Sequence, residues 1–161
     1  MVALFSAAAK EDSMLAYDPS SNPLNNNEWS FPLLEIIHIA GFTLSVGTIA
    51  LVDLRLLDWG FLRRPVKQMW KDTAPWTLFG LAIMLTTGPL IFSSDPNMYL
   101  HNQSFKFKMV ALLVAIIYNY TIHRKVASSE SSSGGLAKLV AGVSLALWVS
   151  VVAGGLFIAF V

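Results

Sequence analysis

The chain has 161 residues, of which 55% are hydrophobic and only 13% are charged, and its mean hydropathy is +0.58. A soluble domain carries about 25% charged residues, and half of that share could not cover a folded body of this size in water, so a water-soluble domain is excluded. The net charge of +1 comes without a basic stripe and the chain has no cysteine, which argues against nucleic-acid binding and excludes disulfides and thiolate metal sites.

The N-terminal residues 1–30 include the loop-like run Asp18-Pro19, and we expect them to form an external tail. Four apolar stretches follow. A bilayer core about 30 Å thick is crossed by roughly 20 apolar residues in a helix, and the stretches that meet this length are about 31–57, 73–94, 105–122 and 139–161. The sequence therefore predicts an all-α integral membrane protein, with a bundle of four transmembrane helices formed by residues 31–161.

The connections between these spans have signals of their own. Asp95 followed by Pro96 is typical of a helix start, and we expect a short interfacial helix from there to about His101. Ser104 is then expected to cap the third span. The run SSESSSGG at residues 128–135 predicts a flexible linker before the fourth span.

Lysine and arginine are distributed unevenly between the two sides of this bundle. Cytoplasmic loops of membrane proteins are enriched in these residues, and one side carries Arg55, Arg63, Arg64, Lys67, Lys71, Arg124, Lys125 and Lys138. The other side carries only Lys10, Lys106 and Lys108. We expect the first side to be cytoplasmic, so that both termini and the loop between the second and third spans face outward.

His38 is the strongest candidate for a functional residue, because it lies about 10 Å inside the first span at 1.5 Å per residue. An ionisable side chain at such a depth usually has a role, although a neutral imidazole bonded to a neighbouring helix is the structural alternative. His101 lies in the outer loop, from which it could fold over the bundle. His123 closes the third span on the inner side, roughly 17 Å from His38 along the membrane normal, and is expected to be an interfacial cation.

Small residues lie at the depth of His38 in three of the spans. Gly41 follows His38, Gly88 precedes Pro89 in the second span, and Gly154 lies in the fourth. Glycine permits close approach, and proline frees a carbonyl group and bends its helix. This level could therefore hold a flat macrocycle, with tight helix packing through small residues as the alternative.

These features together predict one b-type haem in the outer half of the bundle. His38 and His101 would be its axial ligands, with Met98 or Met109 as replacements for His101. Two axial histidines leave no open position for a substrate, which favours electron transfer to a quinone or an external redox protein over catalysis. The cations at the outer rim that could pair with the haem propionates are Lys106 and Lys108.

Two other functions are alternatives to a haem protein. Glu35 and His38 share one helical face, and the outer loop adds Met98 and His101, a set that would suit a copper or zinc ion. The second alternative is a non-catalytic accessory subunit of a larger membrane complex or a homo-oligomer, since the chain has no serine-nucleophile, zinc-protease or nucleotide-binding motif.

A second polar cluster is expected in the inner half of the bundle. Because its residues lie near the membrane boundary, where charges cost little, we interpret it as an ion-pair network that anchors the first span to the third. A site for a quinone head group or a proton relay is the alternative. The residues are Asp53, Arg55 and Asp58 in the first span and Tyr118, Asn119, Tyr120 and His123 in the third.

Part of the sequence resembles a known group of proteins. The runs LLEIIHIAGFTLSVGTIALVDLRLLDWGFLRRP and LAIMLTTGPLIFSSDPNMYLHNQSFKFKMVALLVAIIYN resemble poorly characterised small bacterial four-helix membrane proteins, which are similar to copper-resistance D-type and b-type cytochrome membrane domains. The resemblance covers about residues 31–125. It implies the bacterial inner membrane, with periplasmic termini, and His38 as a ligand position, but no established activity. The chain departs from the two-haem pattern because only His38 lies within a span.

Overall fold

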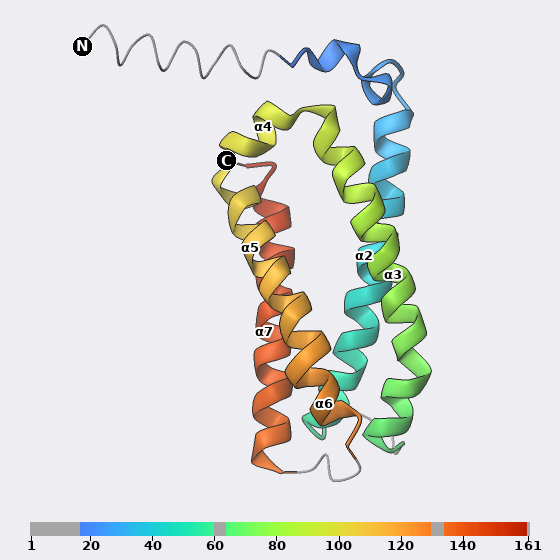
Figure 1. Cartoon of the computed structure of the whole chain (residues 1–161), viewed down its shortest axis with the longest axis vertical. Coiled ribbons are helices and arrows are strands. Elements are labelled where there is room, and N and C mark those ends of the chain that lie inside the picture. Colours follow the sequence, from blue (N-terminus) through green and yellow to red (C-terminus); the bar gives the residue numbers. More distant parts are fainter. Residues whose placement is uncertain (1–16, 60–63, 130–133, 161) are drawn as a thin grey trace, which may run out of the picture.

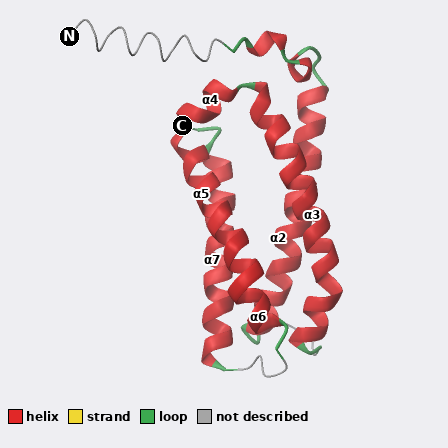
Figure 2. Cartoon of the chain, viewed as in Figure 1, coloured by secondary structure: helices red, strands yellow, loops and turns green. Residues whose placement is uncertain are grey.

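The computed structural model describes residues 17–59, 64–129 and 134–160, a part of the chain that consists of helices and loops without strands (Figures 1 and 2). In chain order, the helices are η1 (Pro19–Ser21), η2 (Pro23–Asn25), α2 (Ser30–Leu56), α3 (Val66–Ser94), α4 (Pro96–His101), α5 (Gln103–Tyr118), the π-helical turn η3 (Asn119–His123), α6 (Arg124–Ala127) and α7 (Gly135–Phe157).

Four helices are long and apolar enough to cross a membrane, namely α2, α3, the continuous helix Gln103–Ala127 and α7. The predicted fold class is therefore confirmed. The main difference is at the start of α3, which begins at Val66 because its first turns, with Lys67 and Lys71, are helical but too polar for a hydropathy criterion to include. The start of α2 and the end of α7 lie at the same end of the bundle (Figure 1).

The predicted short helix after Asp95 is present as α4, and the Asp95 side chain accepts a hydrogen bond from the Met98 backbone N–H at 3.0 Å. The predicted cap at Ser104 is wrong. Asn102 is the cap instead, because its Oδ1 accepts from the Phe105 backbone N–H at 2.9 Å and so starts α5 at Gln103. We refer below to the α4 end and the α6 end of the bundle.

The described part of the N-terminal tail docks on the end of α3. The Tyr17 hydroxyl and the Asn22 amide both donate to the Ser93 carbonyl oxygen, and the Asn25 amide donates to the Ser94 carbonyl oxygen at 3.0 Å. The last carbonyl groups of a helix have no partner within the helix. The tail therefore caps α3.

The spans form two antiparallel pairs, α2 with α3 and α5 with α7, and α2 also packs against α7 (Figure 1). Glycines set the closest contacts. A Cβ atom on Gly80 would lie 2.5 Å from the Gly41 carbonyl oxygen, and one on Gly154 would lie 3.1 Å from Lys108 Cβ. Since α3 makes few direct contacts with α5, the two pairs are joined mainly through α2 and α7.

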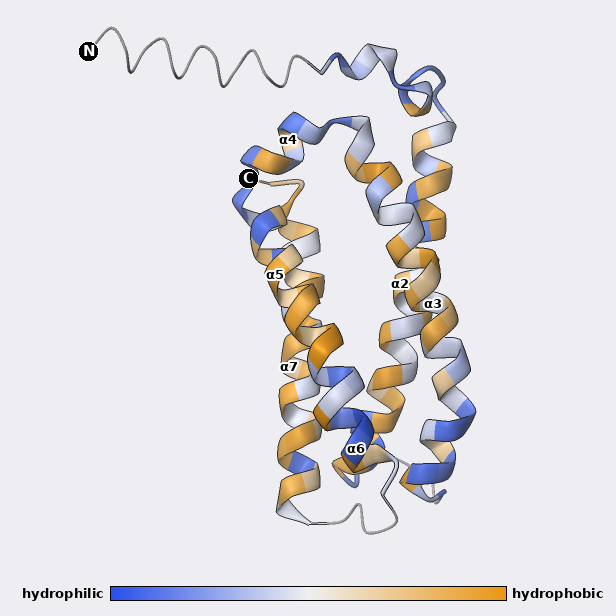
Figure 3. Ribbon diagram, viewed as in Figure 1, coloured by the Kyte–Doolittle hydropathy of each residue, from blue (hydrophilic) through white to orange (hydrophobic). Residues whose placement is uncertain are grey.

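The core extends from the middle of the bundle to the α6 end. In α2 the buried residues begin only at Gly41. The middle cluster contains Ile49, Leu81, Met84, Ala111, Leu112, Ala115, Trp148 and Val151, and the cluster at the α6 end contains Val52, Leu56, Val66, Met69, Ala127, Ala137 and Ala141. Apolar residues also cover much of the length of the spans on the outside, as expected for a surface in lipid (Figure 3).

Candidate functional site

His38 is held by α3 in one tautomer. Its Nδ1 lies 2.7 Å from Thr87 Oγ1, and the Thr87 hydroxyl donates to the Ile83 carbonyl oxygen, also at 2.7 Å. Since the Thr87 proton is used in that bond, His38 Nδ1 must be the donor to Thr87. The neutral ring then carries its lone pair on Nε2, which makes no hydrogen bond within the described residues. Histidines that bind metals have this arrangement, with one nitrogen donating and the other available.

Lys108 of α5 reaches into the same region. It is close enough to His38 to interact with it electrostatically, and its half-buried side chain runs over α7, with Nζ 3.5 Å from where a Cβ atom on Gly155 would be. No ion pair joins Lys108 to an acidic side chain in the described part of the chain. Lys106, in contrast, is exposed. Lys108 is therefore available to an anionic group beside His38.

The three glycines predicted to form a slot differ in their surroundings. A Cβ atom on Gly41 would lie 2.6 Å from Ile83 Cγ2. A Cβ atom on Gly154 would lie 3.1 Å from both Phe107 Cδ1 and Lys108 Cβ. These two contacts favour the packing alternative for Gly41 and Gly154. Gly88 lies against the His38 ring, since a Cβ there would be 3.5 Å from His38 Cε1.

His101 is the last residue of α4, and its side chain is exposed. The side chain of Met98, in the same helix, is also exposed. Its Nδ1 lies 2.8 Å from the Asn97 carbonyl oxygen, which can only accept, so Nε2 again keeps the lone pair. No hydrogen bond joins His101 to His38 in the described structure. The two predicted ligands thus have matching tautomers but are not brought into contact.

Glu35 lies near α4, where it acts on Tyr99. Burial first, and then the negative charge of Glu35, raises the pKa of the Tyr99 phenol.

Within residues 17–59, 64–129 and 134–160, no group of three or more histidine, aspartate or glutamate side chains is arranged to hold a metal ion. The copper or zinc set predicted around Glu35 and Met98 stays a prediction.

The polar cluster at the α6 end has a buried centre that the sequence does not predict. Asp53 is fully buried; its Oδ1 lies 2.7 Å from His123 Nε2 and its Oδ2 accepts from the Ser144 hydroxyl at 2.6 Å. The prediction that His123 lies at the interface is wrong, because only 2% of the residue is exposed and its ring is bonded between spans. We call Asp53, His123 and Ser144 the Asp53 cluster. Within the predicted ion-pair network, Arg55 pairs with Asp58, with Nη1 to Oδ1 at 3.4 Å.

The Asp53 cluster fixes the orientation of the His123 ring. An ionised carboxylate only accepts hydrogen bonds, so with Asp53 ionised His123 Nε2 carries a proton and donates to Asp53 Oδ1, and in the neutral form of the ring the lone pair is then on Nδ1. Nδ1 makes no hydrogen bond within the described residues. His123 ends the π-helical turn η3, a widened type of turn that often occurs at functional sites.

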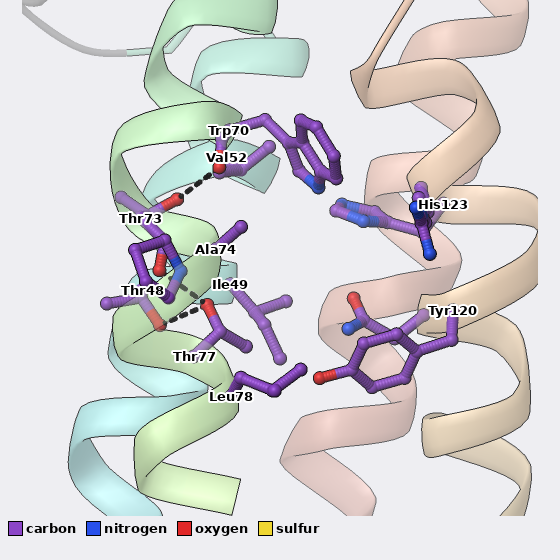
Figure 4. Close-up of a pocket in the computed structure, with 13 residues that line it drawn as sticks. Thr48, Ile49, Val52, Trp70, Thr73, Ala74, Thr77, Leu78, Tyr120 and His123 are labelled. Carbon is purple, nitrogen blue, oxygen red and sulfur yellow. Dashed lines mark hydrogen bonds between the residues drawn. The ribbon is translucent and has the colours of Figure 1, made fainter.

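A cavity of about 300 Å³ lies beside His123 (Figure 4). This volume is at the lower end of the range for small-molecule sites. The cavity is lined from α2 by Thr48, Ile49 and Val52, from α3 by Trp70, Thr73, Ala74, Pro75, Thr77 and Leu78, and from η3 and α6 by Asn119, Tyr120, His123 and Arg124. We call it the inner pocket.

One polar side chain of the inner pocket is buried without a hydrogen-bond partner in the described structure, the Tyr120 hydroxyl. Asn119, a second polar lining residue, is only 8% exposed. By contrast, the hydroxyls of Thr48 and Thr77 bond to each other at 2.7 Å. A buried polar group without a partner costs about 1–3 kcal/mol. The unpaired Tyr120 hydroxyl therefore marks a place where a polar molecule would be stabilised.

Sequence reasoning identified Asp53 and His123 but missed Ser144 and the burial of the whole cluster. A signal was present for Asp53. Gly41, Ser45 and Ile49 precede it at four-residue steps, and all four lie on the buried stripe of α2. For Ser144 no comparable signal exists, because the fourth span is apolar on every side and its rotation is set only by packing.

The chain belongs to the family of unknown function DUF6644, which it matches over residues 32–161. Comparison with the curated proteins and with the solved structures gives no significant match.

Proposed function

We propose that this protein is a b-type haem electron-transfer protein, or a subunit of an electron-transfer complex, with the haem at the α4 end of the bundle. The observation that carries the proposal is the state of His38. Its Nδ1 donates to Thr87 and its Nε2 is left with a free lone pair inside a membrane span. Such a histidine is prepared to bind iron.

Two further observations support an anionic, iron-containing group. Lys108 provides a half-buried cation near His38 without an acidic partner in the described structure, which suits a propionate. His101 has the same tautomer as His38, and its turn toward the bundle would complete a bis-histidine pair. Bound haem would supply reversible one-electron chemistry, and the residues of the chain would set its potential through ligand identity and burial.

The proposal places the protein in the bacterial inner membrane with its termini in the periplasm. The α4 end would then face outward, and electrons would pass to a quinone or to an external redox protein. The asymmetry of lysine and arginine supports this orientation.

The test is an absorption spectrum of the native protein, purified in detergent under conditions that retain haem, before and after reduction with dithionite. We expect sharp reduced α and β bands that His38→Ala abolishes. His101→Ala should convert a six-coordinate spectrum into a five-coordinate one.

A matched pair of threonine variants provides the control. Thr87→Val removes the hydrogen bond that orients His38 and should lower haem affinity about tenfold or more. Thr86→Val removes only a hydroxyl bonded to the carbonyl group of its own helix and should leave the spectrum unchanged. Haem-free native protein, or bands that persist in His38→Ala, would refute the proposal and favour an accessory-subunit role.

A further inference from the structure

The inner pocket lies at the opposite end of the bundle from His38 and is independent of haem binding. We propose that it binds the ring head group of a lipid-soluble quinone or its reduced quinol form. The argument rests on how the pocket is reached, on the polar groups that it presents and on the charge of its walls.

The pocket is accessible to a lipid-soluble molecule. Its walls belong to membrane-spanning helices. The pocket lies between α3 and the η3–α6 part of the third span, and α3 has few direct contacts with α5, the preceding part of that span. On the α3 side the lining includes Ala74 and Leu78, and Leu78 is 57% exposed. An apolar tail could therefore lie along α3 in the bilayer while a head group occupies the pocket.

The polar groups suit a ring with oxygen atoms on opposite sides. In Figure 4 the Tyr120 hydroxyl lies at one end of the pocket, and Trp70 and His123 lie at the other. The Tyr120 O–H has no hydrogen-bond partner in the described structure and can donate to one carbonyl oxygen. The indole N–H of Trp70, which also lines the pocket, is a donor for the other. In its neutral form His123, whose ring is oriented by the Asp53 cluster, can accept through Nδ1 from a hydroxyl of the reduced ring.

The charge of the walls favours this ligand over a phospholipid head group. Arg124 is the one cation among the lining residues, and its guanidinium group stacks on the Trp70 ring at 5.9 Å from the ring centroid. Phosphate sites usually combine several cations or clustered backbone N–H groups. A neutral ring between aromatic side chains needs neither, and a volume of about 300 Å³ accommodates a substituted ring.

The experiment uses the full chain in phosphatidylcholine nanodiscs and a photoreactive azido-benzoquinone with a short alkyl tail. We expect labelling of peptides from α3 and from the η3–α6 region, and displacement of the probe by unlabelled benzoquinone with the same tail. Ala74→Phe, which places a ring in the pocket, should abolish labelling.

Two tyrosine variants separate binding from stability. Tyr120→Phe should weaken binding about fivefold, the effect of one hydrogen bond, without lowering the melting temperature, because this hydroxyl has no partner in the protein. Tyr118→Phe is the matched control. It removes a hydrogen bond of 3.1 Å to the Val140 carbonyl oxygen, so it should lower the melting temperature and leave binding unchanged.

The proposal is overturned if phosphatidylglycerol displaces the probe and the unlabelled quinone does not, which would identify a phospholipid site. It is also overturned if Tyr120→Phe and Ala74→Phe label like the unaltered protein. Because the readout does not involve iron, binding by protein without haem bands would support this proposal while the proposal of a haem site failed.

Discussion

Replacing Asp53 by alanine is expected to destabilise the bundle much more than replacing it by asparagine. The carboxylate holds two buried partners, His123 Nε2 at 2.7 Å and the Ser144 hydroxyl at 2.6 Å. Alanine leaves both without this partner, although His123 and Ser144 are only 2% and 1% exposed. Each such group costs about 1–3 kcal/mol, so Asp53→Ala should lower the free energy of unfolding by about 2–6 kcal/mol.

Asparagine can keep both hydrogen bonds. Its carbonyl oxygen can accept from Ser144, and its amide can donate to His123 Nε2 if the imidazole proton moves to Nδ1. The loss is then the difference between a charged and a neutral hydrogen-bond partner, about 1 kcal/mol. Asp58→Ala is the surface control, since this aspartate is exposed and its pairs with Arg55 and Lys138 contribute less than about 1 kcal/mol.

The assay is equilibrium unfolding in mixed micelles with increasing dodecyl sulfate, followed by tryptophan fluorescence, for which the buried Trp148 is a suitable probe. We expect the order native, Asp53→Asn, Asp53→Ala from most to least stable. If the alanine and asparagine variants differ by less than about 0.5 kcal/mol, the hydrogen bonds of Asp53 do not stabilise the fold and the reasoning fails.

Three further predictions concern packing, the tail and topology. Gly80→Ala should lower the melting temperature strongly, at a cost of about 1–3 kcal/mol, because its Cβ would lie 2.5 Å from a backbone oxygen of α2. Gly47→Ala is the control, since the space around Gly47 is open and the melting temperature should not fall. Equal shifts in the two variants would contradict this packing. Asn22→Ala removes one of the hydrogen bonds that cap α3 and should speed proteolysis near Tyr17, and an unchanged rate would show that this bond does not hold the tail. In this cysteine-free chain, single cysteines at Gln103 and Ser129 should react with a membrane-impermeant reagent from the periplasmic and cytoplasmic sides, respectively, and the opposite pattern would reverse the topology.

The four spans could be predicted because an apolar run of sufficient length has few alternatives to a membrane helix. The α4 start was also predictable, since the Asp95-Pro96 signal is local and the cap bond it implies forms within one turn. The cap at α5 was missed because Asn102 and Ser104 are both capable caps, and the choice depends on where α4 ends.

The candidate sites were harder to predict because they depend on helix rotation. Counting residues gave the depth of His123 but not the direction of its ring, which only the packing of α2 and α7 against α5 determines. The contact between His38 and Thr87 has the same cause. No spacing in the sequence relates these two residues, which lie 49 positions apart and meet because glycines bring α2 and α3 together.

The Asp53 cluster also constrains the order in which the protein can be assembled. His123 and Ser144 are 70 and 91 residues from Asp53 along the chain, and the three residues belong to three different spans, the last of which is α7. During synthesis Asp53 is therefore translated well before either partner. Its hydrogen bonds can be completed only after the final span has been inserted and has turned Ser144 inward. The cluster thus distinguishes a finished bundle from a truncated one, and a protein that loses α7 would keep a buried acid that quality-control proteases could recognise through local unfolding.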